Sequence, residues 1–98
     1  MKNSLMSLIL VLGATFYDDW YQGKLTASGV PFSQSAYHGA SSRYALGTKL
    51  KLTRGGKQVI VKIVDKCNCE LDLSKIAFKK LGLLSEGRIK VQVQRIYN

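Results

Sequence analysis

The stretch TKLKLTRGGKQVIVKIVD, residues 48–65, decides the fold class of this chain. In residues 48–53 leucines alternate with polar residues, and in residues 57–65 valine and isoleucine recur at every second position. A period of two places these apolar side chains on one face of a β-strand. The Arg-Gly-Gly between the two segments supplies a turn, so the pattern predicts a β-hairpin.

The rest of the chain predicts one more strand, one helix and long loops. Residues 88–97 alternate again and predict a strand, whereas residues 72–84 have helical spacing, with Ser74 as the N-cap and Gly82 at the end. Residues 24–47 are rich in Gly, Ser and Ala and predict mostly loop, with room for one short strand. We therefore expect an all-β domain with one short helix, closed into a small barrel because closure removes exposed strand edges.

Length and charge limit the number of domains and the class of partner. With 98 residues the chain is one domain at most, and 46% hydrophobic residues predict a packed core. The 15 Lys and Arg against 6 Asp and Glu give a formal charge of +9, which favours an anionic partner. The lysines are spread along the chain without a contiguous basic arm, so we expect no nucleic acid partner.

The N-terminal segment carries a short apolar run, residues 5–14, behind a single lysine. This run is typical either of a secretory signal or of a first β-strand. A cut after Ala14 would place Leu12 where a small residue is needed, and the run is far shorter than the roughly 20 residues of a membrane-spanning helix. We therefore treat residues 1–12 as a signal or an apolar strand and residues 13–98 as the folded domain, and we expect no stable membrane span.

Six sequence segments occur in a recognisable order. They are GATFYD (13–18), GKLTASGVPF (23–32), LGTKLKLT (46–53), GGKQVIVKIVDKC (55–67), LDLSKIAFKKLGL (71–83) and GRIKVQV (87–93). Their order and spacing resemble the double-psi β-barrel domain of the rare lipoprotein A (RlpA) family and, more distantly, expansins, barwin-like proteins and family-45 endoglucanases. The resemblance covers about residues 13–97 and implies a six-stranded double-psi β-barrel with an open polysaccharide groove across one face.

The same resemblance implies a role in remodelling the bacterial cell wall. Enzymes of the RlpA type are lytic transglycosylases that cleave between MurNAc and GlcNAc: an acidic residue protonates the glycosidic oxygen, and the sugar's own 6-hydroxyl closes a 1,6-anhydro ring. The expected partner is then peptidoglycan or another anionic wall polysaccharide, without a cofactor, for a protein of the secreted or periplasmic cell envelope. Asp65 and Asp72 fall on acidic positions of the family and are the candidate catalytic acids.

Three positions depart from the family pattern. Val30 stands where the family has a functional glutamate, Ser33 where aspartate is usual, and Ser41 where a histidine precedes the Leu-Gly-Thr motif. His38 lies three residues earlier and could replace that histidine only with a rearranged loop. The departures leave a second interpretation open: a non-catalytic, expansin-like glycan binder or a structural component of a bacteriophage virion, with oligomer or virion partners.

The two candidate acids also have structural alternatives. Asp65 ends an apolar strand, where partial burial could raise its pKa, but an aspartate at a strand end is also a common turn former. Asp72 precedes Ser74 by two residues and could act either on a substrate or on the N-terminus of the helix. At one mouth of a barrel, each charge would oppose ionisation of the other carboxyl group.

Candidate substrate-binding residues lie in two further segments. Thr15, Tyr17 and Asp18 match the strand that lines the groove in expansins, and Asp18 falls where family-45 endoglucanases keep a catalytic base. Tyr17 and Trp20 could stack on sugar rings, and His38, the one histidine, lies in a loop rich in Gly, Ala and Ser. The alternative for an aromatic residue is a place in the core, and for His38 a solvated place in the loop.

The two cysteines, Cys67 and Cys69, are one residue apart. They resemble the cysteine motif of expansin- and barwin-like proteins, shortened by one residue, and either form a disulfide with each other or remain free thiols. One histidine and two cysteines are too few soft ligands for a closed zinc site of the usual spacing, so we expect no metal.

Overall fold

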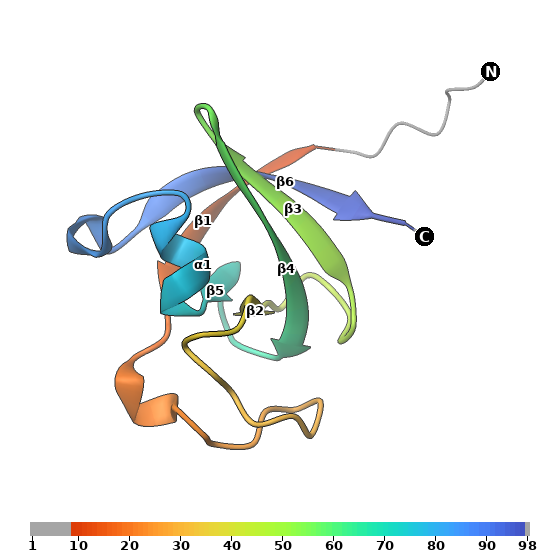
Figure 1. The fold of residues 1–98 in the computed structure, drawn as a ribbon. Coiled ribbons are helices and arrows are strands. Elements are labelled where there is room, and N and C mark those ends of the chain that lie inside the picture. The colour runs from red at the N-terminus through yellow and green to blue at the C-terminus, as the bar shows by residue number, and fades with distance from the viewer. Residues whose placement is uncertain (1–8, 98) are drawn as a thin grey trace.

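The computed structural model describes residues 9–97 and forms a closed six-stranded β-barrel (Figure 1). Around the barrel the strands follow the order β1-β5-β2-β4-β3-β6. Their bounds are Leu10–Phe16 (β1), His38–Ala40 (β2), Lys49–Arg54 (β3), Lys57–Asp65 (β4), Leu71–Leu73 (β5) and Ile89–Ile96 (β6). The helices in this part of the chain are α1 (Lys75–Lys79) and the 3-10 helices η1 (Asp19–Tyr21) and η2 (Leu84–Glu86). The expected all-β class with one short α-helix, closed into a barrel, is confirmed.

The predicted hairpin forms from β3 and β4, which pair antiparallel with Lys51 opposite Ile60. Leu50 and Leu52 of β3 are fully buried, as are alternate residues of β4 that point into the barrel. The residues between them point outward, so the alternation in the sequence is an alternation between core and solvent. β6 pairs with the other edge of β3 and shows the same alternation, which confirms the last predicted strand.

Pairing between distant segments closes the barrel. β1 pairs antiparallel with β6, with Leu12 opposite Val91, and parallel with β5, with Thr15 opposite Asp72. β2 lies between β5 and β4 and runs parallel to β4. Both β2 and β5 contain three residues, so this part of the wall is built from two very short strands. The candidate acids lie in this part of the wall or next to it.

The hydrophobic core fills the barrel and continues under the helix. It takes buried side chains from β1, β3, β4, β5, β6 and α1. Phe78 of α1 is fully buried and packs edge-on against Phe16 of β1, with ring centroids 4.9 Å apart. A second cluster, separate from this core, consists of Tyr17, Phe32 and Ala40, with Cys67 packed against it. We call it the Tyr17 cluster, because it holds the tyrosine in place beside the short strands.

The helix begins after Ser74, as predicted, but does not extend to Gly82. Ser74 occupies the N-cap position, but its hydroxyl donates to the carbonyl oxygen of Ala36 at 2.6 Å and caps no helical amide. α1 ends three residues before Gly82, which does not adopt a positive φ. A Cβ at Gly82 would lie 2.7 Å from both Arg54 Nη1 and Glu86 Oε2. Both atoms are the ends of flexible side chains, which would have to shift to make room for it. The predicted N-cap position of Ser74 is confirmed, although its hydroxyl bonds elsewhere, and the prediction that Gly82 ends the helix is wrong.

The apolar N-terminal run continues into the barrel. β1 begins at Leu10, ahead of the expected start of the domain at residue 13, and Leu12 is buried in the core. Cleavage after Ala14 would therefore remove the residues of β1 that pair with β6. Residues 1–8, which carry the rest of the expected signal or apolar segment, lie outside the described residues. No helix in the described part of the chain is long and apolar enough to cross a membrane.

Candidate functional site

The two candidate acids lie on either side of β2. Ala40 of β2 is in register with Asp65 at the end of β4 and with Asp72 in the middle of β5. Since neighbouring strands are about 4.8 Å apart, the Cα atoms of the two acids are separated by roughly 10 Å. Leu71 and Leu73 point into the core, so the Asp72 side chain between them points out of the barrel. The fold thus brings both acids to neighbouring positions on the wall.

Three hydrogen bonds from separate groups hold the Asp65 carboxylate. The Tyr17 hydroxyl donates to Oδ2 at 2.7 Å, and the backbone amides of Ala27 and Lys66 donate to Oδ1 at 2.9 Å each. A strand-end turn explains the Lys66 contact, but the other two donors come from distant segments that fix the orientation of the group. Ala27 was not predicted as a site residue, although its place in the Thr-Ala-Ser-Gly motif could have indicated it.

Asp72 is half-buried, and its Oδ1 accepts a hydrogen bond from the Thr15 hydroxyl at 2.9 Å. Thr15 lies directly opposite on β1. Burial raises the pKa of Asp72, the bond from Thr15 opposes that shift, and the nearby charge of Asp65 adds to it. Asp72 therefore keeps its proton to a higher pH than an exposed aspartate, as a general acid must. The first backbone amide of α1 donates to the side-chain oxygen of Gln34 at 2.8 Å, so this amide is bonded by Gln34 and not by Asp72.

Tyr17, whose hydroxyl donates to Asp65, is itself buried, with 5% of its surface exposed. Its ring stacks on Phe32 with centroids 4.0 Å apart, and Tyr21 packs against it at 5.3 Å. Burial raises the pKa of Tyr17 well above its ordinary value, and the bond to Asp65 raises it further. The hydroxyl is thus a permanent donor to Asp65, and the ring is not open to stack on a sugar.

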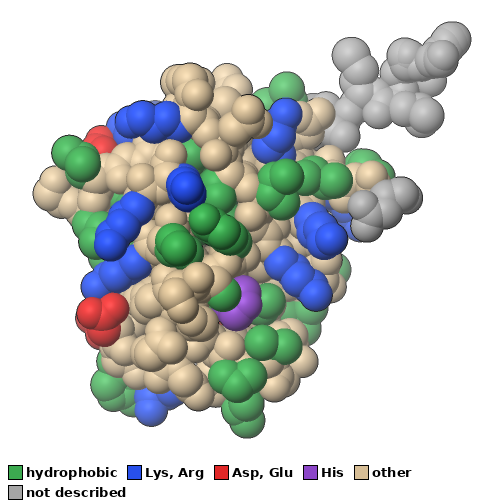
Figure 2. Space-filling view, in the orientation of Figure 1, with side chains coloured by type: hydrophobic (Ala, Val, Ile, Leu, Met, Phe, Trp, Pro, Cys, Tyr) green, Lys and Arg blue, Asp and Glu red, His purple; other side chains and the backbone are tan. Residues whose placement is uncertain are grey.

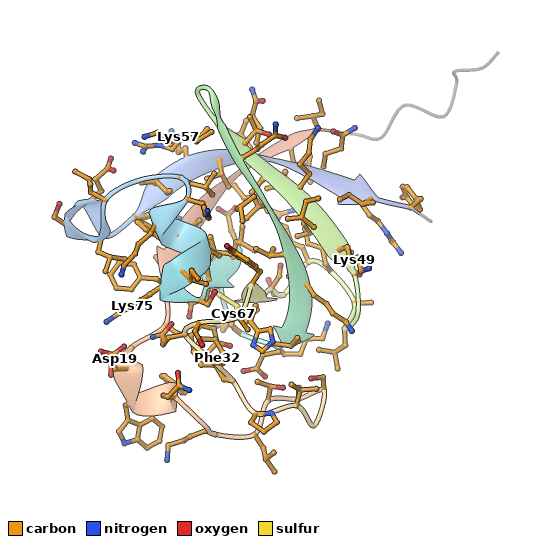
Figure 3. All side chains as sticks on the ribbon, in the orientation of Figure 1. Asp19, Phe32, Lys49, Lys57, Cys67 and Lys75 are labelled. Carbon is orange, nitrogen blue, oxygen red and sulfur yellow. A yellow bond between two sulfur atoms is a disulfide. The ribbon has the colours of Figure 1, made fainter. Side chains whose placement is uncertain are left out.

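The η1 segment places Asp18 and Trp20 at one end of the molecule, in a loop that projects from the barrel (Figure 1). Asp18 Oδ1 accepts a hydrogen bond from the Trp20 amide at 2.7 Å, so this carboxylate caps η1. Trp20 is 66% exposed, with Lys24 Nζ 4.1 Å from the centroid of its ring. An ion pair of 2.9 Å from Lys75 to Asp19 ties the loop to α1 (Figure 3). Of the two predicted residues, Trp20 offers an exposed ring, whereas Asp18 is engaged locally.

His38 begins β2 and is half-buried. The Ser33 amide donates to its Nδ1 at 3.4 Å, which leaves the proton of the neutral ring on Nε2. Burial lowers the pKa of His38, and the charge of Lys62 lowers it further. Lys62 on β4 is in register with His38, so the structure places this histidine beside a lysine rather than beside either acid.

The three positions that depart from the family pattern carry no carboxylate or imidazole. Ser41 is fully buried; its hydroxyl donates to the carbonyl oxygen of Glu70 at 2.6 Å and accepts a hydrogen bond from the Arg43 amide at 3.0 Å. The Ser33 hydroxyl is bonded to a neighbouring serine. Val30 is 45% exposed at the surface. Ser41 in particular has a structural role and cannot reach a substrate.

Cys67 and Cys69 are joined by a disulfide, with their Cα atoms 5.2 Å apart. Cys67 also packs against the Tyr17 cluster, and Figure 3 shows it close to Phe32. The bridge follows Lys66 directly, so it restrains the segment whose amide binds Asp65. Among residues 9–97, no group of three or more His, Cys, Asp or Glu side chains is placed to hold a metal ion.

A pocket of about 390 Å³ begins beside Asp65. It is lined by Ala27, Ser28, Val30, Leu46, Gly47, Lys62, Ile63 and Val64. Ala27 donates its amide to Asp65, and Val64 precedes Asp65 in β4, so two of the lining residues are neighbours of Asp65, which does not itself line the pocket. The walls are mainly aliphatic, and the charged side chain among them is Lys62. We call it the Lys62 pocket; its walls come from three separate segments, so no local sequence pattern indicated it.

Comparison with known proteins assigns the family. A family model described as lytic transglycolase matches residues 13–93. The chain belongs to this RlpA-like double-psi β-barrel family. An uncharacterized protein of Synechocystis sp. is 33% identical over 90 residues, which are 90% of this chain and 100% of that protein. The probable endolytic peptidoglycan transglycosylase RlpA of Aquifex aeolicus is 39% identical over 88 residues, which are 80% of this chain but 39% of that protein. The chain thus spans the whole of one relative and less than half of the other.

Solved structures share the fold of this chain. The Streptomyces papain inhibitor matches with a TM-score of 0.77 and 22% identity over 95% of this chain and 98% of the other. A mutant Clavibacter michiganensis expansin in complex with cellohexaose matches with a TM-score of 0.75 and 23% identity over 92% of this chain and 51% of the other. At these identities the likeness shows the fold alone, and the six-stranded double-psi β-barrel of this RlpA-like chain is confirmed.

Proposed function

We propose that this RlpA-like chain binds glycan strands of bacterial peptidoglycan over the β5-β2-β4 wall and cleaves them between MurNAc and GlcNAc. The observation that carries the proposal is Asp72, a half-buried carboxyl group with a raised pKa, held by Thr15 and separated from Asp65 by one strand. The RlpA relative from Aquifex aeolicus, named as a peptidoglycan transglycosylase, supports this class of substrate.

Asp72 is the proposed proton donor. Its proton passes to the glycosidic oxygen while the bond from that oxygen to C1 of MurNAc breaks. The 6-hydroxyl oxygen of the same MurNAc then bonds to C1, and the hydroxyl proton returns to the Asp72 carboxylate. The products are a 1,6-anhydro-MurNAc end and a GlcNAc end with a free 4-hydroxyl, and no water is consumed. One carboxyl group serves as acid and then as base, whereas ordinary glycoside hydrolases use two.

Asp65 is the proposed partner charge. Its bonds from Tyr17 and Ala27 fix the carboxylate, which raises the pKa of Asp72 and stabilises positive charge that develops at C1. Tyr17 acts through its hydroxyl and is a positioning residue. Thr15 positions Asp72 in the same way, and Trp20 offers an exposed ring to a more distant sugar.

The proposed substrate implies a location outside the cytoplasm. Peptidoglycan lies beyond the cytoplasmic membrane, so the active protein would be secreted or periplasmic. The disulfide between Cys67 and Cys69 supports this location, because disulfides persist in oxidising compartments. The two relatives described above provide no support for the virion alternative.

A non-catalytic glycan binder is the second candidate function. The observation that favours it is the set of three departures from the family pattern, Val30, Ser33 and Ser41. They leave the two candidate aspartates, Asp65 and Asp72, but remove the glutamate, the further aspartate and the histidine that the family resemblance led us to expect. A binder would use the same surface and the same exposed ring without the proton transfer.

Purified peptidoglycan sacculi separate the two functions. We expect the wild-type chain to release muropeptides with 1,6-anhydro ends, detected by mass spectrometry, and Asp72→Asn to abolish them. The matched control is Glu86→Gln, which should retain activity. Glu86 lies on η2 and is paired with Arg54 of β3. If the wild type sediments with sacculi but releases no anhydro product, the enzyme proposal fails and the binder stands. If Asp72→Asn and Asp65→Asn both keep full activity, the site assignment is wrong.

A further inference from the structure

The outer side of β3 carries two lysines, each beside an aliphatic side chain of a neighbouring strand. Lys49 is in register with Ile96 of β6, and Lys51 is in register with Ile60 of β4. Both lysines alternate with buried leucines and therefore point away from the core. Since side chains in register lie about 5 Å apart, these four residues form one continuous surface.

The same surface extends to β1. Gln92 of β6 is in register with Thr53 of β3 on one side and with Val11 of β1 on the other. Val11 is 61% exposed, and Ile60 at the other edge of the surface is 52% exposed. Single exposed aliphatic residues are ordinary, but here they occur together with lysines on neighbouring strands. We call the surface formed by Val11, Lys49, Lys51, Ile60 and Ile96 the β3 face.

No acidic side chain lies on the β3 face. The six Asp and Glu of the chain all lie elsewhere, in the loop around η1, at the two candidate acids, before β5 and in η2. The salt bridges within residues 9–97 use other cations, namely Arg43, Arg54, Lys75 and Arg88. Figure 3 labels Lys49 at the right-hand side of the barrel, where Figure 2 shows Lys and Arg side chains but no Asp or Glu. The face is therefore positively charged and favours a partner that carries negative charge.

The exposed aliphatic side chains narrow the class of partner to a lipid surface. Lysines are attracted to anionic headgroups, and aliphatic side chains between them can enter the boundary of the hydrocarbon. A nucleic acid or another soluble polyanion supplies the negative charge but no hydrocarbon for Ile60 and Val11. The chain that leads into β1 has the same apolar character: Ile9 is 56% exposed, and residues 5–8 are Leu-Met-Ser-Leu.

We propose that the β3 face binds peripherally to an anionic phospholipid bilayer. In the ring of strands, β3 lies opposite β5, with two strands between them on either side. Lys51 points out of the barrel from β3 and Asp72 points out of it from β5, so they face opposite sides of the molecule. A barrel that lies on a membrane by the β3 face presents Asp72 away from the membrane, where a glycan strand can reach it. Membrane binding itself does not depend on the proposed cleavage, because it uses neither acid.

Sedimentation of the full chain with lipid vesicles tests the β3 face. The probes are vesicles of phosphatidylglycerol and phosphatidylcholine in equal parts, and vesicles of phosphatidylcholine alone. We expect the chain to sediment with the anionic vesicles and much less with the neutral ones. Lys49→Gln/Lys51→Gln should bind anionic vesicles about thirtyfold more weakly, because each lysine near such a surface contributes roughly fivefold. Ile60→Gln should lower the affinity about fivefold, because it loses apolar contact with the bilayer.

Each of these variants has a matched control outside the β3 face. Lys79→Gln/Lys80→Gln removes the same charge from two exposed lysines at the end of α1. Leu83→Gln replaces an aliphatic side chain that is 69% exposed on the loop after α1. Both controls should keep most of the wild-type affinity for anionic vesicles. Lys49→Arg/Lys51→Arg should also retain binding, because both positive charges are kept.

The outcomes separate this inference from its alternatives. Absence of sedimentation with anionic vesicles overturns it and leaves glycan cleavage untouched. Equal losses in the two Lys→Gln double variants overturn it as well, because net charge alone would then explain the binding. If Ile60→Gln binds as tightly as the wild type, or if duplex DNA binds the β3 face as tightly as the vesicles do, a bilayer is the wrong partner. If the chain binds vesicles through the β3 face but sacculi yield no anhydro product, this inference stands and the catalytic proposal fails.

Discussion

The hydrogen bond from Tyr17 to Asp65 can be removed without disturbing the packing around it. Tyr17→Phe deletes the hydroxyl, which donates to Asp65 Oδ2 at 2.7 Å. The ring keeps its stacking on Phe32 at 4.0 Å and its edge contact with Tyr21 at 5.3 Å. The substitution therefore isolates one contact between β1 and the end of β4.

The size of the effect follows from the surroundings of Asp65. A hydrogen bond to a charged group contributes about 1.5–3 kcal/mol. Asp65 keeps its amide donors from Ala27 and Lys66 and is half-exposed, so water can replace part of the lost bond. We expect Tyr17→Phe to lower the free energy of unfolding by about 1–2 kcal/mol, with a fall in Tm of about 4–8 °C per kcal/mol for a domain of this size.

Urea and thermal unfolding measure the loss, with Tyr21→Phe as the matched control. Tyr21 is 44% exposed and contacts the same ring, but its hydroxyl makes no hydrogen bond among residues 9–97. The control should change stability by less than about 0.5 kcal/mol. Anhydro-muropeptide release should fall about tenfold or more in Tyr17→Phe, because Asp65 loses its fixed orientation. Equal stability and activity in the two variants would refute the positioning role of the hydroxyl.

The remaining predictions concern the raised pKa, the core and the disulfide. The pKa of Asp72 is raised in the folded chain, so ionisation of this group lowers the stability as pH rises above about 4, the ordinary pKa of an aspartate. We therefore expect Asp72→Asn to stabilise the chain at pH 7 but not at pH 3. Urea unfolding that shows the same gain at both pH values would contradict this. Phe78→Ala removes a fully buried ring packed on Phe16 and should cost about 3–5 kcal/mol by denaturant unfolding, whereas a loss below about 1 kcal/mol would contradict the packing. Cys67→Ser/Cys69→Ser removes a disulfide that closes a very small ring, so it should lower the free energy of unfolding by about 1–2 kcal/mol. Reductant should cause no further loss in this variant. A loss above about 4 kcal/mol would contradict a merely local effect of the bridge.

The sequence predicted the parts of the fold that carry a long periodic pattern. The hairpin and β6 have six or more residues each, enough for the alternation to appear. β5 and β2 have three residues each, too few for a period. The sequence left room for one short strand in residues 24–47, where β2 lies, but it assigned residues 72 and 73 of β5 to the helix, which was wrong. Ser74 shows that a local capping pattern does not determine the hydrogen bond of the side chain. Its hydroxyl donates to a carbonyl oxygen of the loop before β2 and accepts no bond from a helical amide.

The candidate site was predictable in its acids but not in its connections. Asp65 and Asp72 stood out from motif and position, whereas the bond from Tyr17 to Asp65 joins residues 48 apart and depends on barrel closure. The raised pKa of Asp72 depends on burial, which no spacing in the sequence reports. Asp18 resembled a catalytic position, yet its carboxylate caps η1, because a backbone amide two residues on lies within its reach.

The position of β1 in the barrel also bears on how the chain can fold while it is made. β1 pairs with β5 and β6, which lie near the other end of the chain, so the ring cannot close until β6 is available. Pairings of such large sequence separation form slowly. A nascent chain therefore emerges from the ribosome with its first strand unpartnered, and β1 finds its antiparallel neighbour only after β6 has followed.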